Sequence, residues 1–318
     1  MNNAEQIKET IARIFPDVET VICYQQGFDG LHATPYFISI PEQVNKLIWN
    51  PLCAQNLTSY LPSIKKKVGI VVKGCDSRTI IQYLQEGLID RAKVVIIGVP
   101  CTGVISVKKV LREIGHQPVV DVVFDDNGNI VVKTQKGEKR LAIADVCPDK
   151  CTTCQYPTPL VYDHLIGEPI ASNKPKEDVY KDIREFDAKT LEEKRAYWEK
   201  EFERCIRCYA CRNACPMCIC QDSCIAETRE PHWISQRLSL QEKFMFHMIH
   251  AAHLAGRCVE CGECERVCPM DIPVAKLKKK INAEMKELFN YETGVNPDDK
   301  PPMYTFNVDE AKIKEHKL

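Results

Sequence analysis

The sequence lacks an excess of charge of either sign. Its 318 residues include 43 lysines and arginines and 44 aspartates and glutamates, which gives a net charge of −1. Binding to nucleic acid or to a lipid surface relies on a strong charge bias, so we expect neither partner. No hydrophobic stretch approaches the roughly 20 residues of a membrane-spanning helix, so we expect no direct membrane insertion. The first residues, MNNAEQ, lack the basic start and apolar region of a secretory signal, which favours a cytoplasmic location.

Three common cofactor and catalytic fingerprints are also absent. The chain has no Gly-x-Gly-x-x-Gly motif after a strand, no P-loop and no nucleophile elbow. Residues 74–78 (GCDSR) and 98–103 (GVPCTG) offer turns whose backbone amides are suited to a phosphate. A flavin such as FAD is therefore a hypothesis that no dinucleotide fingerprint supports.

Cysteine, in contrast, is abundant, with 18 residues, and eight of them form two runs of identical spacing. The runs are Cys205-x2-Cys208-x2-Cys211-x3-Cys215-Pro216 and Cys258-x2-Cys261-x2-Cys264-x3-Cys268-Pro269. This is the spacing with which bacterial ferredoxins hold two [4Fe–4S] clusters, and the fourth cysteine of each run binds the other cluster. The sequence therefore predicts two clusters, and metal-bound thiolates agree with a reducing compartment.

The exchange of the fourth cysteine defines two ligand sets. One cluster is expected to bind Cys205, Cys208, Cys211 and Cys268, and the other Cys258, Cys261, Cys264 and Cys215. Since each set needs both runs, metal binding and folding should be coupled. The alternative is a pair of zinc sites, although these usually join two Cys-x2-Cys hooks across a longer gap. Apolar neighbours are expected to keep water from the clusters: Ile206, Tyr209, Ala210, Val259 and Val267.

The first half of the chain has the pattern of an α/β domain. Residues 67–73 and 93–99 are apolar runs typical of buried strands, and each is followed by a turn and a helical pattern, over 78–87 and up to about Gly115. Strand, helix, strand and helix in this order favour a parallel sheet. Residues 118–133 then read as a hairpin around the turn Asp125–Asn129.

The second half has helical patterns around the cysteine runs. Helices are expected from about Thr190 up to the first run, over 238–256 within an insertion (225–257), and over 274–289. Residues 165–190 are rich in charge and proline and are interpreted as a linker. The predicted fold class is α+β, with an α/β domain (1–164), this linker, a helical domain around a two-cluster ferredoxin core (191–290) and an extended tail (291–318).

A candidate third metal site lies in the N-terminal half. Cys75 and Cys101 follow the carboxyl ends of two adjacent predicted strands, where ligands bind in open α/β sheets. Both are also expected to precede helix N-termini, whose dipole favours the thiolate. Cys147, Cys151 and Cys154 add three thiols on one short segment. The alternative is that Cys75 and Cys101 are small residues in tight turns and that the 147–154 segment is structural.

Other residues leave two interpretations open. Cys218, Cys220 and Cys224 follow the first run, either as small thiols that shield a cluster or as an additional metal site.

His247, His250 and His253 lie on roughly one face of a predicted helix, either packed against the second cluster or as zinc or haem ligands. Cys23 and Cys53 have no partner pattern. The basic residues of 276–280 are expected to form a solvated helix face, with a docking patch for an acidic partner as the alternative.

These motifs resemble known redox proteins over about residues 65–290. KGCDSR, IIGVPCTG and the Cys147–Cys154 segment resemble the beta-subunit family of deazaflavin-dependent hydrogenases and formate dehydrogenases. HLAGRCVECGECERVCPMDIP is similar to dicluster proteins found beside heterodisulfide reductase and formate dehydrogenase subunits in strict anaerobes. CPMCIC is similar to a run in anaerobic sulfite reductase and sulfhydrogenase subunits. The hydrogenase beta subunits have their ferredoxin-like cysteines first, an order that is reversed here, so no flavin-binding residue is carried over.

The resemblance implies an electron-transfer subunit of a multisubunit anaerobic oxidoreductase. Its expected partners are a flavoprotein, hydrogenase or formate dehydrogenase module on one side and a heterodisulfide reductase-like module on the other. One alternative is a catalytic subunit that itself bears a flavin and exchanges electrons with its partners through the clusters. The other alternative is a zinc-stabilised scaffold.

Overall fold

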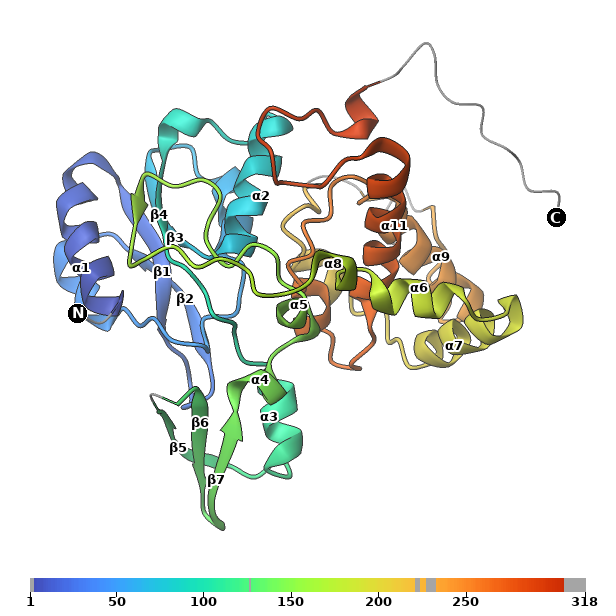
Figure 1. Ribbon diagram of the computed structural model, residues 1–318, viewed down its shortest axis with the longest axis horizontal. Coiled ribbons are helices and arrows are strands. Elements are labelled where there is room, and N and C mark those ends of the chain that lie inside the picture. Colours follow the sequence, from blue (N-terminus) through green and yellow to red (C-terminus); the bar gives the residue numbers. More distant parts are fainter. Residues whose placement is uncertain (1–2, 126, 221–223, 227–232, 306–318) are drawn as a thin grey trace.

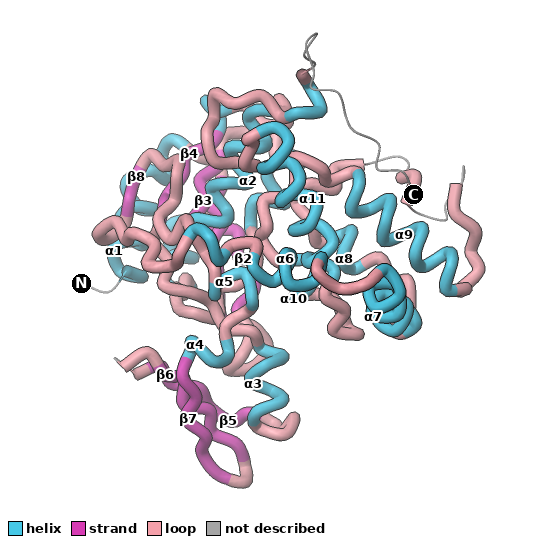
Figure 2. Tube along the Cα trace, turned by 45° about the vertical axis from the view of Figure 1, so that its right-hand side comes forward, coloured by secondary structure: helices cyan, strands magenta, loops and turns pink. Residues whose placement is uncertain are grey.

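The computed structural model describes residues 3–125, 127–220, 224–226 and 233–305. Figure 1 shows an α/β part built from the first half of the chain, a group of helices from the second half beside it, and a small antiparallel sheet that projects from the body. Figure 2 shows the same projection from another side. Part of the predicted insertion (227–232) and the end of the predicted tail (306–318) lie outside the described residues.

A five-stranded sheet forms the centre of the α/β part, in the order β2-β1-β3-β4-β8. Neighbours in the row β1, β3, β4 and β8 pair in parallel, and β2 pairs with β1 antiparallel. The strands are β1 (Thr20–Gln26), β2 (Ala33–Ile38), β3 (Val68–Val72), β4 (Val94–Gly98) and β8 (His164–Leu165). The predicted mostly parallel sheet is confirmed, although β1, β2 and β8 were not foreseen.

Two helices cover the faces of this sheet, α1 (Asn3–Ile14) and α2 (Gly74–Gln85). Ile70 and Val72 of β3 pack in one core with α2, whereas Val71 packs in the other core with α1. Every residue of β3 is buried for this reason, and such burial on both faces explains its uninterrupted apolar run.

The helix after β3 begins four residues earlier than predicted. Residues 74–77 were expected to form a turn, but α2 starts at Gly74, and the Asp76 carboxylate accepts the backbone N–H of Lys73 at 3.0 Å. A Cβ at position 74 would lie 1.7 Å from the carbonyl oxygen of Tyr156. Glycine therefore allows the loop after Cys154 to contact the first turn of α2.

The small sheet is a three-stranded meander of β5 (Val119–Phe124), β6 (Asn129–Thr134) and β7 (Gly137–Ala142). The predicted hairpin is confirmed as β5 and β6, while β7 was missed. In the turn, the Asp125 carboxylate accepts the backbone N–H of both Asn127 and Asn129. The sheet packs on α3 (Val107–Glu113), and α4 (Ile143–Val146) and α5 (Asp149–Thr152) then lead back to the body.

The second half of the chain contributes six helices to the described residues. They are α6 (Lys181–Asp187), α7 (Leu191–Glu203), α8 (Ala210–Asn213), α9 (Leu240–Ala252), α10 (Glu263–Arg266) and α11 (Val274–Phe289). The predicted helices correspond to α7, α9 and α11, and Thr190 caps α7 through the N–H of Glu193. The segment interpreted as a linker contains α6, which lies against α11, where Lys279 pairs with Asp182 at 2.6 Å. The domain boundaries stay an interpretation.

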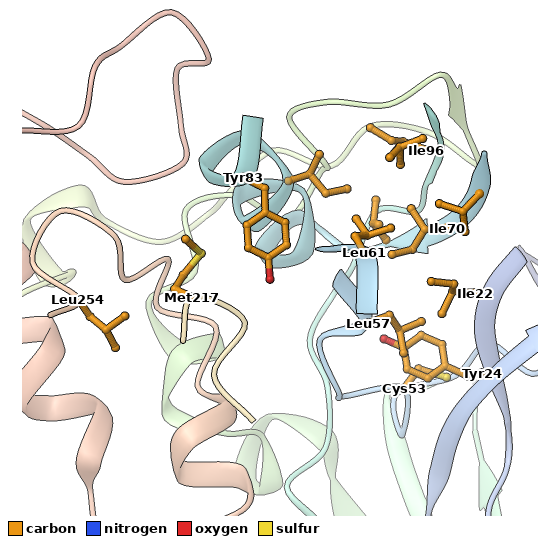
Figure 3. Close-up of a cluster of buried hydrophobic side chains, with 14 residues drawn as sticks. Ile22, Tyr24, Cys53, Leu57, Leu61, Ile70, Tyr83, Ile96, Met217 and Leu254 are labelled. Atoms are coloured by element: carbon orange, nitrogen blue, oxygen red, sulfur yellow. The ribbon is translucent and has the colours of Figure 1, made fainter. Parts of the chain in front are cut away.

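The two halves share one hydrophobic core. Figure 3 shows Met217 and Leu254 from the second half in the same cluster as Tyr83 of α2 and the strand residues Ile70 and Ile96. At the same interface, the Nε and Nη2 groups of Arg257 donate to the two oxygens of the Glu86 carboxylate, whose side chain is fully buried. The residues around the cysteine runs are therefore held directly against the α/β part. Among the described residues, no helix has the length and apolar character needed to cross a membrane.

Candidate metal centres

The first cysteine group consists of Cys205, Cys208, Cys211 and Cys268, and the structure brings all four to one cavity. The side chains of Phe246, His247 and Ile272 also line this cavity. Cys205, Cys211 and Cys268 are buried, whereas Cys208 is exposed. Cys268, from the second run, therefore lies with three cysteines of the first run, as the ferredoxin pattern requires.

The second cysteine group consists of Cys258, Cys261, Cys264 and Cys215. Cys215 comes from the first run, yet it interacts electrostatically with the first three cysteines of the second run. The fourth cysteine of each run, Cys215 or Cys268, therefore lies with three cysteines of the other run. The ligand sets predicted from the sequence match these two groups, and their role as ligands stays a prediction.

The two runs have the same backbone path. Arg207 and Tyr209 have positive φ angles of 49° and 59°, and the equivalent residues Glu260 and Gly262 have φ angles of 56° and 71°. A short helix follows in each run, α8 after Tyr209 and α10 after Gly262. Non-glycine residues in this region are strained and occur where the surroundings enforce them. The repeated strain fits loops that are wrapped around a bound group.

The donor set fits iron–sulfur clusters. Burial raises the pKa of the Cys211 and Cys258 thiols to about 12, and it also raises the pKa of Cys264. A buried thiolate needs a nearby positive charge, which bound iron supplies. Backbone N–H groups of Arg207 and Ile272 donate to the Cys205 and Cys268 sulfurs, both at 3.4 Å. Such contacts orient ligands and tune a metal site.

Two of the three predicted histidines contact cysteine sulfurs. His247 Nε2 lies 3.3 Å from the Cys205 sulfur, and His250 Nε2 lies 3.2 Å from the Cys218 sulfur. Desolvation lowers the pKa of His247 to about 3 and that of His250 to about 4, so both rings are neutral. The expectation of packing against the second cluster holds for His250, which hydrogen-bonds Cys215. It is wrong for His247, which contacts the first group, and for His253, which is exposed.

The three cysteines after the first run do not form one group. Cys218 donates to Cys215, which holds the pKa of Cys215 well below its usual range, and the ligand atoms of Cys215, Cys218 and His250 lie within 4.8 Å of one another. Cys220 is exposed and interacts with Cys224 instead. The contact of Cys218 favours the shielding interpretation for that residue.

The N-terminal cysteine group consists of Cys75, Cys101, Cys147, Cys151 and Cys154. Cys151 interacts electrostatically with Cys101, Cys147 and Cys154, and Cys101 also interacts with Cys75. The structure therefore gathers all five from three segments of the chain. Cys23 and Cys53, which have no partner pattern, are buried in the cores of the α/β part.

The expected position at a helix N-terminus holds for Cys75, which lies in the first turn of α2, and is wrong for Cys101, which is six residues before the start of α3. Burial raises the pKa of Cys75 to about 12 and that of Cys101 to about 11, because desolvation disfavours the thiolate. The positive charges of Lys150 and Lys73 oppose this shift at both cysteines.

A single lysine joins the N-terminal group to the second cysteine group. Lys150 interacts electrostatically with Cys75 and Cys151, and its Nζ donates to the carbonyl oxygen of Cys261 at 2.5 Å. A Cβ at Gly262 would lie 3.0 Å from the Lys150 side chain. Tyr209 has almost the same backbone conformation in the first run, so it is the space taken by Lys150 that favours glycine at position 262.

Two buried lysines were missed or misjudged in the sequence. Lys73 Nζ is fully buried and contacts the Tyr24 hydroxyl at 2.5 Å and the Asp76 carboxylate at 2.8 Å. Lys278 was expected on a solvated face but is buried on α11. It shares a buried helix face with Val274 and Asn282, each four residues away, and the sequence does not show this face because Asn282 is polar. Of the predicted shielding residues, Ile206 lines the cavity of the first group but is 54% exposed, whereas Val259 is buried.

Comparison with known proteins first defines the class of the second half. Residues 201–272 match the family described as a 4Fe-4S dicluster domain. This confirms the predicted iron–sulfur character of the region that contains both cysteine runs.

Comparison over the whole chain then gives particular relatives. The beta subunit of an F420-dependent formate dehydrogenase from Methanocaldococcus jannaschii is 25% identical, over 92% of this chain and 90% of that protein. The beta subunit of F420-dependent formate dehydrogenase 1 from Methanococcus maripaludis is 26% identical, over 90% of this chain and 88% of that protein. The predicted resemblance to this beta-subunit family is confirmed. These alignments span both halves of the chain.

One solved structure shows a weaker likeness. A chain of the F420-reducing [NiFe] hydrogenase complex from Methanosarcina barkeri is 16% identical, over 48% of this chain and 58% of that chain, with a TM-score of 0.37. At this level the likeness supports no conclusion about the fold or the function of the chain.

Proposed function

We propose that this chain is an iron–sulfur electron-transfer subunit of a multisubunit oxidoreductase of the formate dehydrogenase type. The observation that carries the proposal is the exchange of Cys215 and Cys268 between two adjacent cysteine groups. In this proposal the first cysteine group and the second cysteine group each hold one [4Fe–4S] cluster. When bound, such clusters accept and donate single electrons.

The order of the cysteine groups supports a relay with two ends. At one end Cys208 is exposed and Ile206 beside it is half exposed, so a partner subunit can approach the first group closely. At the other end the second group is joined through Lys150 to the N-terminal cysteine group. We propose the N-terminal group as a third metal site and the exposed edge at Cys208 as the docking point of a redox partner.

The names of the relatives favour a formate dehydrogenase-type complex as the source or acceptor of the electrons. A hydrogenase-type module has the same requirement for a one-electron relay. A heterodisulfide reductase-like module was the acceptor predicted from local motifs. Neither of the two relatives is such a protein, and the proposal does not depend on this partner.

The first experiment is to purify the full chain without oxygen and to measure iron, sulfide and zinc per polypeptide. About eight iron atoms with equal sulfide are expected from two four-iron clusters, and about twelve if the N-terminal group holds a third. In the latter case Cys151→Ala should remove about four iron atoms, whereas Cys23→Ala, at a buried thiol outside the groups, should remove none. Zinc in place of iron would contradict the proposal.

A second candidate function is a catalytic subunit that bears its own flavin. It is favoured by the names of the two relatives, which are beta subunits of F420-dependent formate dehydrogenases, because formate oxidation releases two electrons and a flavin can pass them singly to clusters. A yellow chromophore released when the isolated chain is denatured would support it, and a colourless supernatant would count against it.

A further inference from the structure

Lys278 is a buried lysine whose ammonium group has no oxygen acceptor among the described residues. Its side chain is 2% exposed and is one of the largest that are fully buried. Lysine is almost never fully buried unless it is paired, and an uncompensated buried charge is strongly unfavourable. The position therefore implies a negative charge close to the ammonium group that the oxygen atoms around it do not supply.

The groups that face Lys278 come from both cysteine groups. It interacts electrostatically with Cys211 of the first group and with Cys215, Cys258 and Cys264 of the second. The other titratable neighbours are His247 and His250, which are neutral, and Glu265. Among the described residues, no carboxylate forms an ion pair with the Lys278 ammonium.

The next buried polar side chain on the same helix face behaves differently. Asn282, one turn further along α11, donates to the carbonyl oxygen of Cys258 at 2.7 Å and to the Glu260 carboxylate at 2.8 Å. Protein oxygens are therefore within reach of this face, whereas Lys278 is directed at the cysteine sulfurs, including that of Cys264. A helix can bring a long side chain to both groups because α11 lies beside α9 and α10.

We propose that Lys278 is a fixed positive charge shared by the two cysteine groups, which raises the reduction potentials of both clusters held there. The inference rests on the proposed function, because it requires clusters at these groups. One-electron reduction adds one negative charge to a cluster, and a nearby cation stabilises the reduced form more than the oxidised form. Lys278 is a positioning residue in this role, since it acts through the cysteine ligands.

The test compares neutral and charged substitutions in the full chain purified without oxygen. Lys278→Met removes the charge and keeps the length, Lys278→Gln also keeps a hydrogen-bond donor, and Lys278→Arg keeps the charge. Lys280→Met is the matched control, because Lys280 is two residues away on the opposite, exposed side of the same helix. The reduction potentials of both clusters are measured by redox titration followed by electron paramagnetic resonance.

The expected result is a shift of both potentials to more negative values in Lys278→Met and Lys278→Gln, with Lys278→Arg and Lys280→Met close to the unsubstituted chain. Unchanged potentials in the two neutral variants would overturn the proposal. A shift of only one cluster, or a Gln variant that matches the unsubstituted chain, would also overturn it, because the charge would then not be shared or not be needed.

Cluster loss in the variants is informative as well. If the neutral variants lose iron and Lys278→Arg retains both clusters at unchanged potentials, the positive charge is required for assembly, which supports the proposal. If Lys278→Arg also loses iron, the role of Lys278 is one of size and shape, and the proposal fails. Absence of iron from the unsubstituted chain would instead refute the proposed function, before any variant is compared.

Discussion

The Tyr83 hydroxyl donates a hydrogen bond to the carbonyl oxygen of Pro216 at 2.5 Å. Tyr83 lies on α2 of the α/β part, and Pro216 directly follows Cys215 of the second cysteine group. This bond is fully buried and joins residues 133 positions apart. The conformation of the loop that carries Cys215 is therefore fixed in part by the α/β half of the chain.

Tyr83→Phe should lower the free energy of unfolding by about 1–3 kcal/mol, because the Pro216 carbonyl is left buried and unpaired. It should also speed the loss of iron from the second cysteine group. The control is Tyr36→Phe, which removes a buried hydroxyl that has no partner among the described residues and should be neutral. Chemical denaturation followed by circular dichroism and cluster absorbance measures both effects, and equal stability of the two variants would contradict this role of Tyr83.

Gly262→Ala should destabilise the protein by more than Gly87→Ala does. Both glycines have a positive φ, 71° and 66°, and alanine there costs about 1–2 kcal/mol. At Gly262 the added methyl group also crowds Lys150, whereas nothing lies within 4 Å of a Cβ at Gly87. The difference between the two unfolding free energies therefore reports the contact between the N-terminal group and the second group. A difference of zero would mean that Lys150 moves aside without cost.

Cys211→Ala and Cys268→Ala should damage the same cluster, although the two residues belong to different runs. Cys215→Ala should damage the other cluster. The reason is the exchange of the fourth cysteines between the two groups. Electron paramagnetic resonance of the reduced variants distinguishes the two signals. Loss of the same signal from Cys211→Ala and Cys215→Ala would show that each run binds its own cluster.

Removal of iron by a chelator should unfold the cysteine loops and leave the main sheet folded. The loops depend on strained residues such as Arg207 and Glu260, and the metal holds thiols from both runs in one place, so metal binding supplies folding free energy. The strands β3 and β4 contain no cysteine of either run, although Cys215 and Cys258 pack against their core. Hydrogen exchange should rise over 205–215 and 258–268 and stay low over 68–72. Uniform loss of protection would indicate one cooperative unit that includes the sheet.

Local sequence patterns predicted the elements that depend on neighbouring residues. The strands β3 and β4, the helices α7, α9 and α11 and the hairpin around Asp125 were all anticipated, because apolar periodicity, capping residues and turn residues act over short distances. The start of α2 was misplaced because it depends on how Tyr156, which is distant in the sequence, packs on Gly74.

By itself the sequence determined the two cysteine runs, because the spacing of thiols around a cluster is a local property of the chain. The same spacing predicted that Cys215 and Cys268 are exchanged, and the packing of two runs about 50 residues apart brings each of them to its partners. Only the tertiary structure decided the surroundings of Lys278. A lysine is recognised as buried only when the helices around it close over its side chain and leave its charge facing both cysteine groups.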